Sequence, residues 1–158
     1  MKFPVVFNIL LALIEDTVMK WNDSDFRETT DKIIKAFYKV YDTIGPGFLE
    51  DAYHKALYLE LKKHFANVDK GREYPIIYDK EVVGHYVPDI VVEERIVIEV
   101  KAVKELNENH KAQLISQLRV TGILIGFLVN FSNKDLIFKR FDNFYEIERQ
   151  GLNETLRD

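Results

Sequence analysis

The chain has 158 residues, of which 47% are hydrophobic and 30% are charged, and its formal net charge is −4 at pH 7. This length and apolar content fit one globular domain with a substantial core. The negative balance excludes a positive field of the whole protein that would attract nucleic acid, so such binding requires a local basic patch. The sequence has no cysteine, which excludes a disulfide framework and thiolate metal sites and fits a reducing cytoplasmic compartment.

The first 24 residues contain an apolar run at positions 3–14. A single lysine precedes the run, Pro4 and Asn8 interrupt it, and no small-residue cleavage site follows, so a signal peptide is disfavoured. The run is also shorter than the ~20 apolar residues that span a bilayer, and we expect no membrane segment. Residues 1–24 are predicted to form an accessory helix that packs on the domain or on a partner chain, including a second copy.

Two helices are predicted before the first strand. Asp25 and Glu28 have the spacing of a capping box, and apolar residues at helical spacing follow them. Gly45-Pro46-Gly47 ends this helix, and Pro46 is suited to begin the second because a first-turn position needs no backbone N–H. The second helix is predicted to run to about Phe65. The domain is expected to occupy residues 25–145.

Beyond residue 72 the pattern changes to short runs rich in β-branched and aromatic residues. The runs EYPIIY, VVGHYVPDIVV and IVIEVKA are predicted to be three consecutive antiparallel strands. Residues 106–121 return to helical spacing with Gly122 as the stop, and ILIGFLVNF and LIFKRF are predicted to be two further strands. The expected order is helix, helix, three strands, helix, two strands, and then a polar C-terminal tail at residues 146–158.

Three charges, Asp89, Glu99 and Lys101, lie in two strands that are otherwise apolar. Alternation along a strand puts Glu99 and Lys101 on the same face. If the loop after Val92 has three residues, Val92 pairs with Ile96 and Asp89 lies directly opposite Glu99, with Cβ atoms ~5 Å apart. The loop lacks the glycine that such hairpins prefer.

Two opposed carboxylates destabilise a sheet, so this pair requires a shared proton or a cation. Carboxylate oxygens suit Mg²⁺, which takes one or two carboxylates and completes its shell with water and substrate phosphate. Lys101 is placed to orient an attacking water or to neutralise charge on phosphate. The pattern is typical of phosphodiester cleavage. Glycosidases also use paired carboxylates, but they do not require the lysine. The alternative to a catalytic site is a solvated Glu99–Lys101 pair on an edge strand, with Asp89 in a turn.

Several ordered motifs resemble those of the GxxExxY proteins. GFLEDAY at residues 47–53 matches the G-x-x-E-x-x-Y signature. It is followed in that family's order by Val83-Gly84, Pro88-Asp89, Glu99-Val100-Lys101-Ala102, His110-x-x-Gln113-Leu114, and Thr121-Gly122 through Asn130-Phe131. The resemblance covers about residues 33–141. That family resembles the PD-(D/E)xK nuclease superfamily, which implies a restriction-endonuclease-like α/β fold. Its α-β-β-β-α-β core is a mixed sheet flanked by helices, here with an extra N-terminal helix.

The resemblance implies a Mg²⁺-dependent site, with Mn²⁺ as a substitute ion. Asp89, Glu99 and the Val100 carbonyl would hold the metal, and Lys101 would be the catalytic lysine. Glu50 would be an extra acid from the preceding helix, and Gln113 a polar residue from the following one. The implied function is nuclease-like hydrolysis, of DNA before RNA. The alternative is a catalytically inactive module of the same fold that binds nucleic acid or a protein partner.

The helix-borne residues also have plainer interpretations. An acid in a first turn, such as Glu50, complements the helix dipole by ~0.3–1 kcal/mol. Tyr53 fits core packing with a hydrogen-bonded hydroxyl. His110 and Gln113 flank an apolar stripe, where polar residues commonly mark the boundary with solvent. The basic residues near the site and in the last two strands fit either phosphate contacts or a solvated surface: Lys104, Lys111, Arg119, Lys134, Lys139 and Arg140.

Overall fold

The computed structural model describes residues 23–132 and 134–143. The elements, in chain order, are α2 (Asp23–Ile44), α3 (Glu50–Leu61), β1 (Val68–Asp69), β2 (Tyr74–Tyr78), β3 (Glu81–Tyr86), β4 (Ile90–Val92), β5 (Ile96–Lys101), α4 (Glu108–Thr121), β6 (Ile125–Asn130) and β7 (Ile137–Asp142). The expectations for the apolar run at residues 3–14 and for the tail at 146–158 fall outside the described residues.

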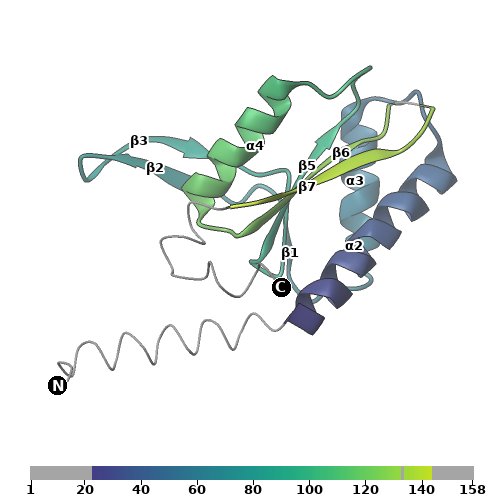
Figure 1. Ribbon diagram of the computed structural model, residues 1–158, viewed down its shortest axis with the longest axis horizontal. Helices are drawn as coiled ribbons and strands as arrows, with labels where there is room; N and C mark the ends of the chain where they lie inside the picture. The colour runs from purple at the N-terminus through teal and green to yellow at the C-terminus, as the bar shows by residue number, and fades with distance from the viewer. Residues whose placement is uncertain (1–22, 133, 144–158) are drawn as a thin grey trace.

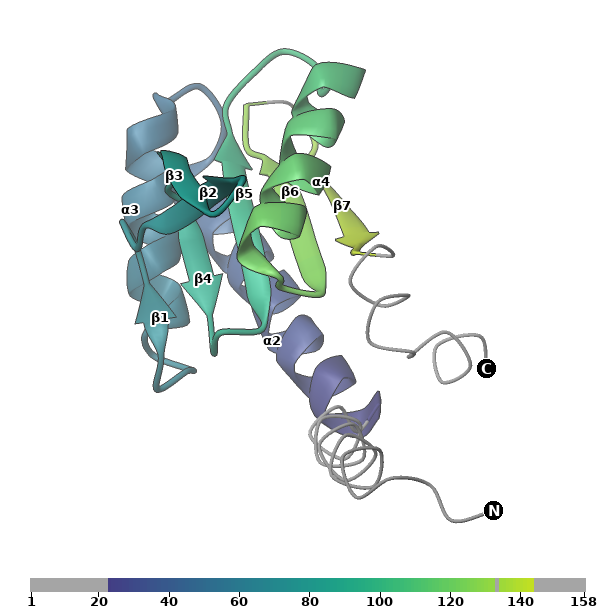
Figure 2. The same cartoon turned by 90° about the vertical axis from the view of Figure 1, so that its left-hand side faces the viewer.

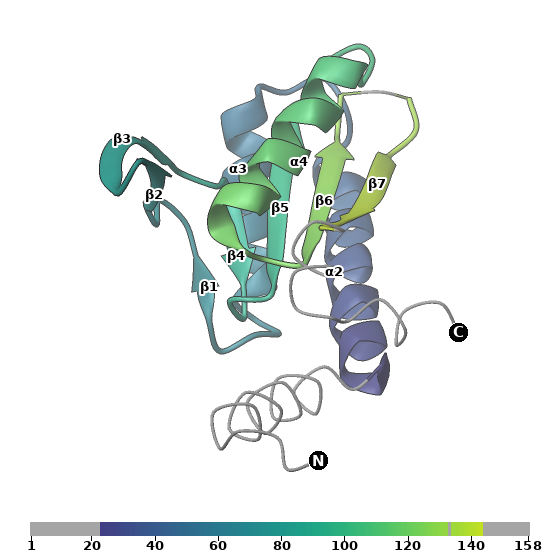
Figure 3. The ribbon, with the colours of Figure 1, turned by 60° about the vertical axis from the view of Figure 1, so that its left-hand side comes forward.

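A five-stranded mixed sheet forms the centre of the domain. Its strand order is β1-β4-β5-β6-β7, as Figure 3 shows from one side to the other. The β5–β6 pair is parallel, and the other neighbours are antiparallel. Helices α2 and α3 cover one face and α4 covers the other (Figure 2). Strands β2 and β3 form a separate two-stranded sheet that projects from the body of the domain (Figure 1).

The alternation along β5 divides the core between the two faces. Ile96, Ile98 and Val100 pack in the cluster on the α2–α3 side, whereas Val97 packs with Leu114 and Leu118 on the α4 side. Since side chains alternate along a strand, Glu99 and Lys101 lie on the α4 side. The sequence prediction that these two charges share a face is therefore confirmed.

Close packing of α4 on the sheet depends on a glycine in β6. A Cβ atom added at Gly126 would lie 3.1 Å from methyl carbons of both Leu114 and Leu118. A larger residue would therefore push the helix away from the strand. None of the helices within residues 23–132 and 134–143 combines the length and apolar character that crossing a membrane requires.

The predicted strand VVGHYVPDIVV is two strands. β3 ends at Tyr86 and β4 begins at Ile90, and among the described strands β3 pairs with β2 alone. Pro88 lies in the break, and because proline has no backbone N–H it cannot continue a ladder in the interior of a sheet. Both expected antiparallel pairings are present, β2 with β3 and β4 with β5. The expectation of one continuous middle strand is wrong, and the two-residue β1 lies beside β4 in the larger sheet.

Two helix starts also differ from the sequence prediction. α2 already includes Asp23, so Asp25 lies inside the helix and is not its cap. α3 begins at Glu50 rather than at Pro46, because Gly45 and Gly47 have φ values of 76° and 100°, outside the helical range. The third helix agrees at its end, where Gly122 is a left-handed C-cap with φ 68°.

Candidate functional site

The β4–β5 hairpin brings Asp89 and Glu99 together. Val92 pairs with Ile96 and Ile90 with Ile98, the register expected from a three-residue loop. This register places Asp89, just before β4, across from Glu99. The backbone N–H of Asp89 donates to Glu99 Oε1 at 3.4 Å, and the Val100 N–H donates to Asp89 Oδ2 at 2.8 Å. The two carboxyl groups thus lie at the same end of the strand pair.

The loop that sets this register has no glycine, and its backbone is held by a distant residue. Glu93 and Glu94 both adopt left-handed conformations, with φ values of 51° and 57°, which are unfavourable for side-chain-bearing residues. The Glu93 N–H donates to the Asn67 carbonyl at 2.8 Å, and the Glu93 carboxylate accepts from the Asn67 N–H and Nδ2. These bonds offset the strain and fix the hairpin.

Glu99 is a buried carboxyl, with 6% of its surface exposed. Burial raises its pKa first and the negative charge of Asp89 raises it further, to about 7. The Tyr86 hydroxyl, which donates to Glu99 Oε1, and the positive charge of Lys101 act in the opposite direction. Burial and the negative charge of Glu99 raise the pKa of the Tyr86 hydroxyl. Glu99 is therefore close to half protonated at neutral pH.

Helix α3 touches the backbone beside both strands that carry the acids. Glu50 Oε2 accepts from the Ala102 N–H, at the end of β5, at 3.2 Å. One turn later, His54 Nε2 donates to the Asp89 carbonyl at 2.8 Å. Glu50 therefore contacts the backbone at the end of β5, and its role at the site stays a prediction.

His54 and Tyr86 were not identified as site residues from the sequence. His54 follows Glu50 by four positions, so it shares a helix face with a residue already selected, and this spacing was a usable signal. Tyr86 lies in an apolar strand three residues before Asp89, and no local pattern marks it. Its role is visible only from its contact with Glu99.

The polar residues of α4 have different surroundings: one caps the helix, one is exposed and one is buried. His110 completes a capping box with Asn107: its N–H donates to Asn107 Oδ1, and its Nδ1 accepts from the Asn107 N–H. Gln113 is exposed, and its role at the site stays a prediction. Gln117 is buried, and its Oε1 has no hydrogen-bond partner among the described residues.

Tyr53 has the packing role expected of it. It is fully buried, it donates to the Gly45 carbonyl at 2.7 Å, and it accepts from the Phe48 N–H at 3.1 Å. Its ring is stacked on Phe131 with centroids 4.9 Å apart. Tyr53 therefore holds the loop that precedes α3 against the core, and this in turn fixes where Glu50 begins its helix.

In each of the carboxylates of Asp89, Glu99 and Glu50, one of the two oxygens accepts no hydrogen bond from a described residue. Asp89 uses Oδ2, Glu99 uses Oε1 and Glu50 uses Oε2. Such oxygens suit a hard cation. No group of three or more His, Asp and Glu side chains in the described part of the chain is gathered closely enough to hold a metal ion. Asp89 and Glu99 are linked by hydrogen bonds between the two strands, whereas Glu50 is held separately at Ala102.

The Val100 carbonyl points to the edge of β5 where Asp89 lies. The Lys101 carbonyl accepts from the Phe131 N–H on the β6 side. Because successive residues of a strand point their backbone groups to opposite edges, the N–H and C=O of Val100 both point away from β6. The N–H meets Asp89, and the carbonyl is directed to the same edge.

Comparison with known proteins gives a family and a fold. The family model of the PD-(D/E)XK nuclease superfamily matches residues 27–141. The crystal structure of SSO0001 superposes with a TM-score of 0.50 at 17% sequence identity, covering 98% of this chain and 86% of that chain. The helix-flanked mixed sheet agrees with the restriction-endonuclease-like fold expected from the sequence. No curated protein matches the chain.

Proposed function

The chain belongs to the PD-(D/E)XK nuclease superfamily, and on this premise we propose that it is a Mg²⁺-dependent hydrolase of phosphodiester bonds, in DNA before RNA. The observation that carries the proposal is the contact between Asp89 and Glu99 beside Lys101. Burial and the neighbouring acid raise the Glu99 pKa to about 7. Two crowded carboxylates are costly in a fold unless a proton or a cation accompanies them, which makes a cation-binding function a physical reason for the pair.

The residues present fit a hard divalent cation. Asp89 and Glu99 each offer a carboxylate oxygen that no described residue engages, and the Val100 carbonyl points to the same edge. Mg²⁺ commonly takes one or two carboxylates and leaves positions for water and phosphate, and Mn²⁺ is the proposed substitute. When bound, the ion would supply a Lewis acid for a phosphate oxygen.

The surrounding residues hold the acids in position. The Val100 N–H fixes the Asp89 carboxylate, and His54 fixes the Asp89 backbone through its carbonyl. The Tyr86 hydroxyl orients Glu99. With these groups fixed, little rearrangement is needed when substrate arrives, which is the condition for strong electrostatic stabilisation of a transition state.

Lys101 is the proposed catalytic lysine. It follows Glu99 by two residues and lies on the same face, and its charge lowers the Glu99 pKa. In hydrolysis, a water oxygen adds to phosphorus while a phosphorus–oxygen ester bond breaks, and negative charge grows on the phosphoryl oxygens. An ammonium group beside the acids stabilises that charge or orients the attacking water. Glu50, held at Ala102, would assist through a water molecule, and Gln113 would contact the substrate from α4.

A cleavage assay with a matched control tests the proposal. The full chain is incubated with single- and double-stranded DNA and RNA, with Mg²⁺, with Mn²⁺ or with a chelator. We expect cation-dependent cleavage that falls by about 10²-fold or more in Lys101→Ala and persists in Lys35→Ala, which changes an exposed lysine on α2. Equal cleavage by the chain and by Lys101→Ala would remove the enzymatic assignment.

One observation favours the alternative of a catalytically inactive binding module. Three acidic or histidine ligands do not converge within the described residues. Thermal unfolding separates the two functions, since a ligand that binds only the native state stabilises it increasingly as the ligand concentration rises above the dissociation constant. A shift with Mg²⁺ that is lost in Asp89→Asn supports the hydrolase, whereas metal-independent nucleic-acid binding without such a shift supports the module.

A further inference from the structure

A basic surface lies on α3 and on the segments that follow α3 and β1. Between positions 54 and 72 the sequence has five lysine or arginine residues against two acids, whereas the whole chain has a net charge of −4. β1 is the edge strand of the larger sheet, and α3 lies at the same side of the domain (Figure 2). This surface is therefore the kind of local basic patch that nucleic-acid binding requires in an acidic chain.

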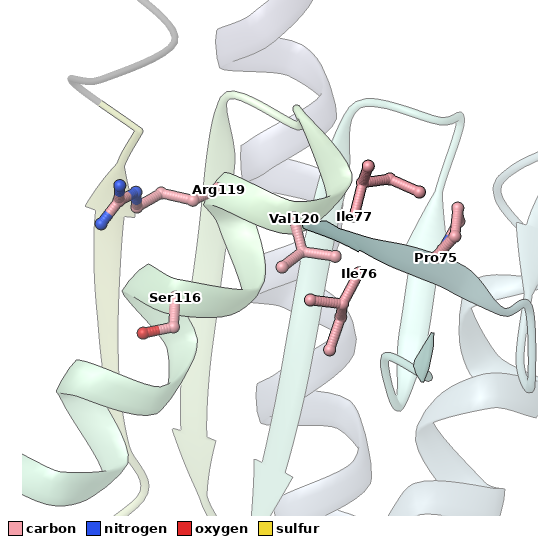
Figure 4. A pocket seen from close by; sticks show the side chains of 6 residues that line it. All are labelled: Pro75, Ile76, Ile77, Ser116, Arg119 and Val120. Carbon is pink, nitrogen blue, oxygen red and sulfur yellow. The ribbon is translucent and has the colours of Figure 1, made fainter. Parts of the chain in front are cut away.

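The groove between β2 and α4 has a different chemical character. It encloses about 460 Å³. Among the described residues that line it, Arg119 alone is charged, and this residue projects on the side of α4 away from β2 (Figure 4). A chain of phosphates requires several cations close together, and the lining of the groove does not provide them. A polyanion is therefore expected at the basic surface and not in the groove.

Most charges of the basic surface are already paired. Three ion pairs involve the acids in and beside it: Asp51 with Lys55, Glu60 with Lys63, and Asp69 with Arg72. Lys62 and Lys70 are exposed, and neither forms an ion pair with a residue in the described part of the chain. These two lysines therefore keep their ammonium groups available for an anion.

The ring of Tyr58 brings the two lysines together. Lys62 Nζ lies 5.4 Å and Lys70 Nζ lies 4.8 Å from the ring centroid. Both distances are those of a cation–π contact, and they put the two ammonium groups within about 10 Å of each other. Such a contact orders a flexible lysine side chain and leaves its charge in water. The arrangement therefore holds two positive charges at one place, where neighbouring phosphates can contact both.

Tyr58 lies one helical turn from a residue that contacts the candidate site. His54 Nε2 donates to the Asp89 carbonyl. Tyr58 and Lys62 follow His54 at intervals of four residues, so all three lie on one face of α3. At 1.5 Å of rise per residue, Tyr58 and Lys62 lie ~6 and ~12 Å along the helix from His54. The basic surface is thus continuous with the residues that hold Asp89.

The strand side gives the same location for Lys70. This residue follows β1, whose last residue pairs with Val91, two positions after Asp89. Its charge also acts on the first turn of α3: the hydrogen bond from Lys55 chiefly lowers the Asp51 pKa, and the positive charge of Lys70 lowers it further. Lys70 therefore lies near the start of β4 and the start of α3.

We propose that Lys62 and Lys70 contact backbone phosphates of a nucleic-acid strand whose cleaved bond lies at Asp89 and Glu99. One strand carries a phosphate for every ~3.4 Å of helix axis, so a separation of ~6–12 Å corresponds to about two to four nucleotides from the cleaved bond. Such contacts position a strand without reading its sequence. The location of the cleaved bond rests on the proposed hydrolase function, whereas binding at the two lysines is measured without cleavage.

Equilibrium binding tests this surface. The full chain is titrated against fluorescein-labelled single- and double-stranded DNA in a chelator, so that no cleavage occurs, and anisotropy gives the affinity at several salt concentrations. Lys62→Ala with Lys70→Ala should weaken binding at low salt by about tenfold or more and reduce the slope of log affinity against log salt by about 1.5–2. The control, Lys35→Ala with Lys39→Ala at exposed positions of α2, makes the same change in net charge and should leave the slope nearly unchanged.

Three outcomes would overturn the proposal: equal losses in the two double variants, no loss in either, or undetectable binding by the unsubstituted chain. Lys62→Arg with Lys70→Arg keeps both charges and should keep the slope, which separates a lost phosphate contact from a disturbed fold. Competition by polyglutamate that is as strong as competition by unlabelled DNA of equal charge would overturn the assignment in favour of an acidic protein partner.

Cleavage separates this inference from the hydrolase function. Bis(p-nitrophenyl) phosphate is a phosphodiester too small to reach the two lysines from Asp89. We expect the ratio of kcat/KM for long DNA to kcat/KM for this small diester to fall about tenfold in Lys62→Ala with Lys70→Ala, and to stay the same in the α2 control. An unchanged ratio would overturn the inference. If the unsubstituted chain bound DNA through the two lysines but hydrolysed neither substrate, the hydrolase function alone would be refuted.

Discussion

Replacing Glu99 with glutamine removes the free-energy cost of ionising a buried carboxyl beside Asp89. Burial and the Asp89 charge raise the Glu99 pKa from 4.5 to about 7. At ~1.4 kcal/mol for each pKa unit, this rise corresponds to about 3 kcal/mol. The native state binds the proton more tightly than the unfolded chain. Stability from Glu99 is therefore fully present below about pH 4.5 and is lost as the pH rises to about 7.

Glutamine keeps the oxygen that accepts from Tyr86 and cannot ionise. Without divalent cations, we therefore expect Glu99→Gln to match the unsubstituted chain at pH 4.5 and to exceed its free energy of unfolding by about 3 kcal/mol at pH 8. Urea unfolding followed by circular dichroism from pH 4.5 to 8 measures the difference. Glu105→Gln, at an exposed position, should show no such trend. If the free energies of unfolding of Glu99→Gln and of the unsubstituted chain differed by the same amount at every pH, the reasoning would be refuted.

Three further substitutions probe the supporting contacts, each by urea unfolding. Tyr86→Phe removes the hydroxyl that donates to the buried carboxylate and should cost about 1.5–3 kcal/mol at pH 8; the exposed Tyr78→Phe should cost almost nothing, and equal effects would contradict this role. Gly126→Ala should cost about 1–3 kcal/mol, since its Cβ meets two leucines of α4 at 3.1 Å. Gly84→Ala, with 3.5 Å to its nearest neighbour, is its control, and an equal or smaller cost at Gly126 would count against close packing there. Tyr53→Phe loses one donated and one accepted hydrogen bond and should cost about 1–3 kcal/mol; an unchanged free energy of unfolding would show that the hydroxyl does not anchor the loop.

The sequence predicts those parts of the fold that local signals determine. Strands β5 and β6 are nearly continuous apolar runs, and α4 ends at a glycine whose left-handed conformation stops it. Alternation within β5 was sufficient to place Glu99 and Lys101 on one face. These features depend on residues close together in the chain, and periodicity reports such features well.

Features that depend on distant contacts were not predicted. The register of the β4–β5 hairpin was predicted, but the contact of Glu93 with Asn67, 26 residues earlier, which holds the glycine-free loop, was not. β1 has only two residues and exists because it pairs with β4. Likewise, His54 joins the site through a backbone carbonyl 35 residues away. The narrower GxxExxY resemblance, the accessory helix and a contact with a partner chain stay predictions.

The central claim is that a divalent cation relieves the crowding of Asp89 and Glu99, and proton release on binding tests it most directly. With a Glu99 pKa of about 7, about half of the chains carry this proton at pH 7, and a bound cation requires the ionised form. Calorimetric titration with Mg²⁺ or Mn²⁺ in two buffers of different ionisation enthalpy counts the protons. The account predicts about half a proton released per ion at pH 7, almost none at pH 9, and no binding in Asp89→Asn. Binding without proton release at pH 7, or unchanged binding in Asp89→Asn, would contradict it.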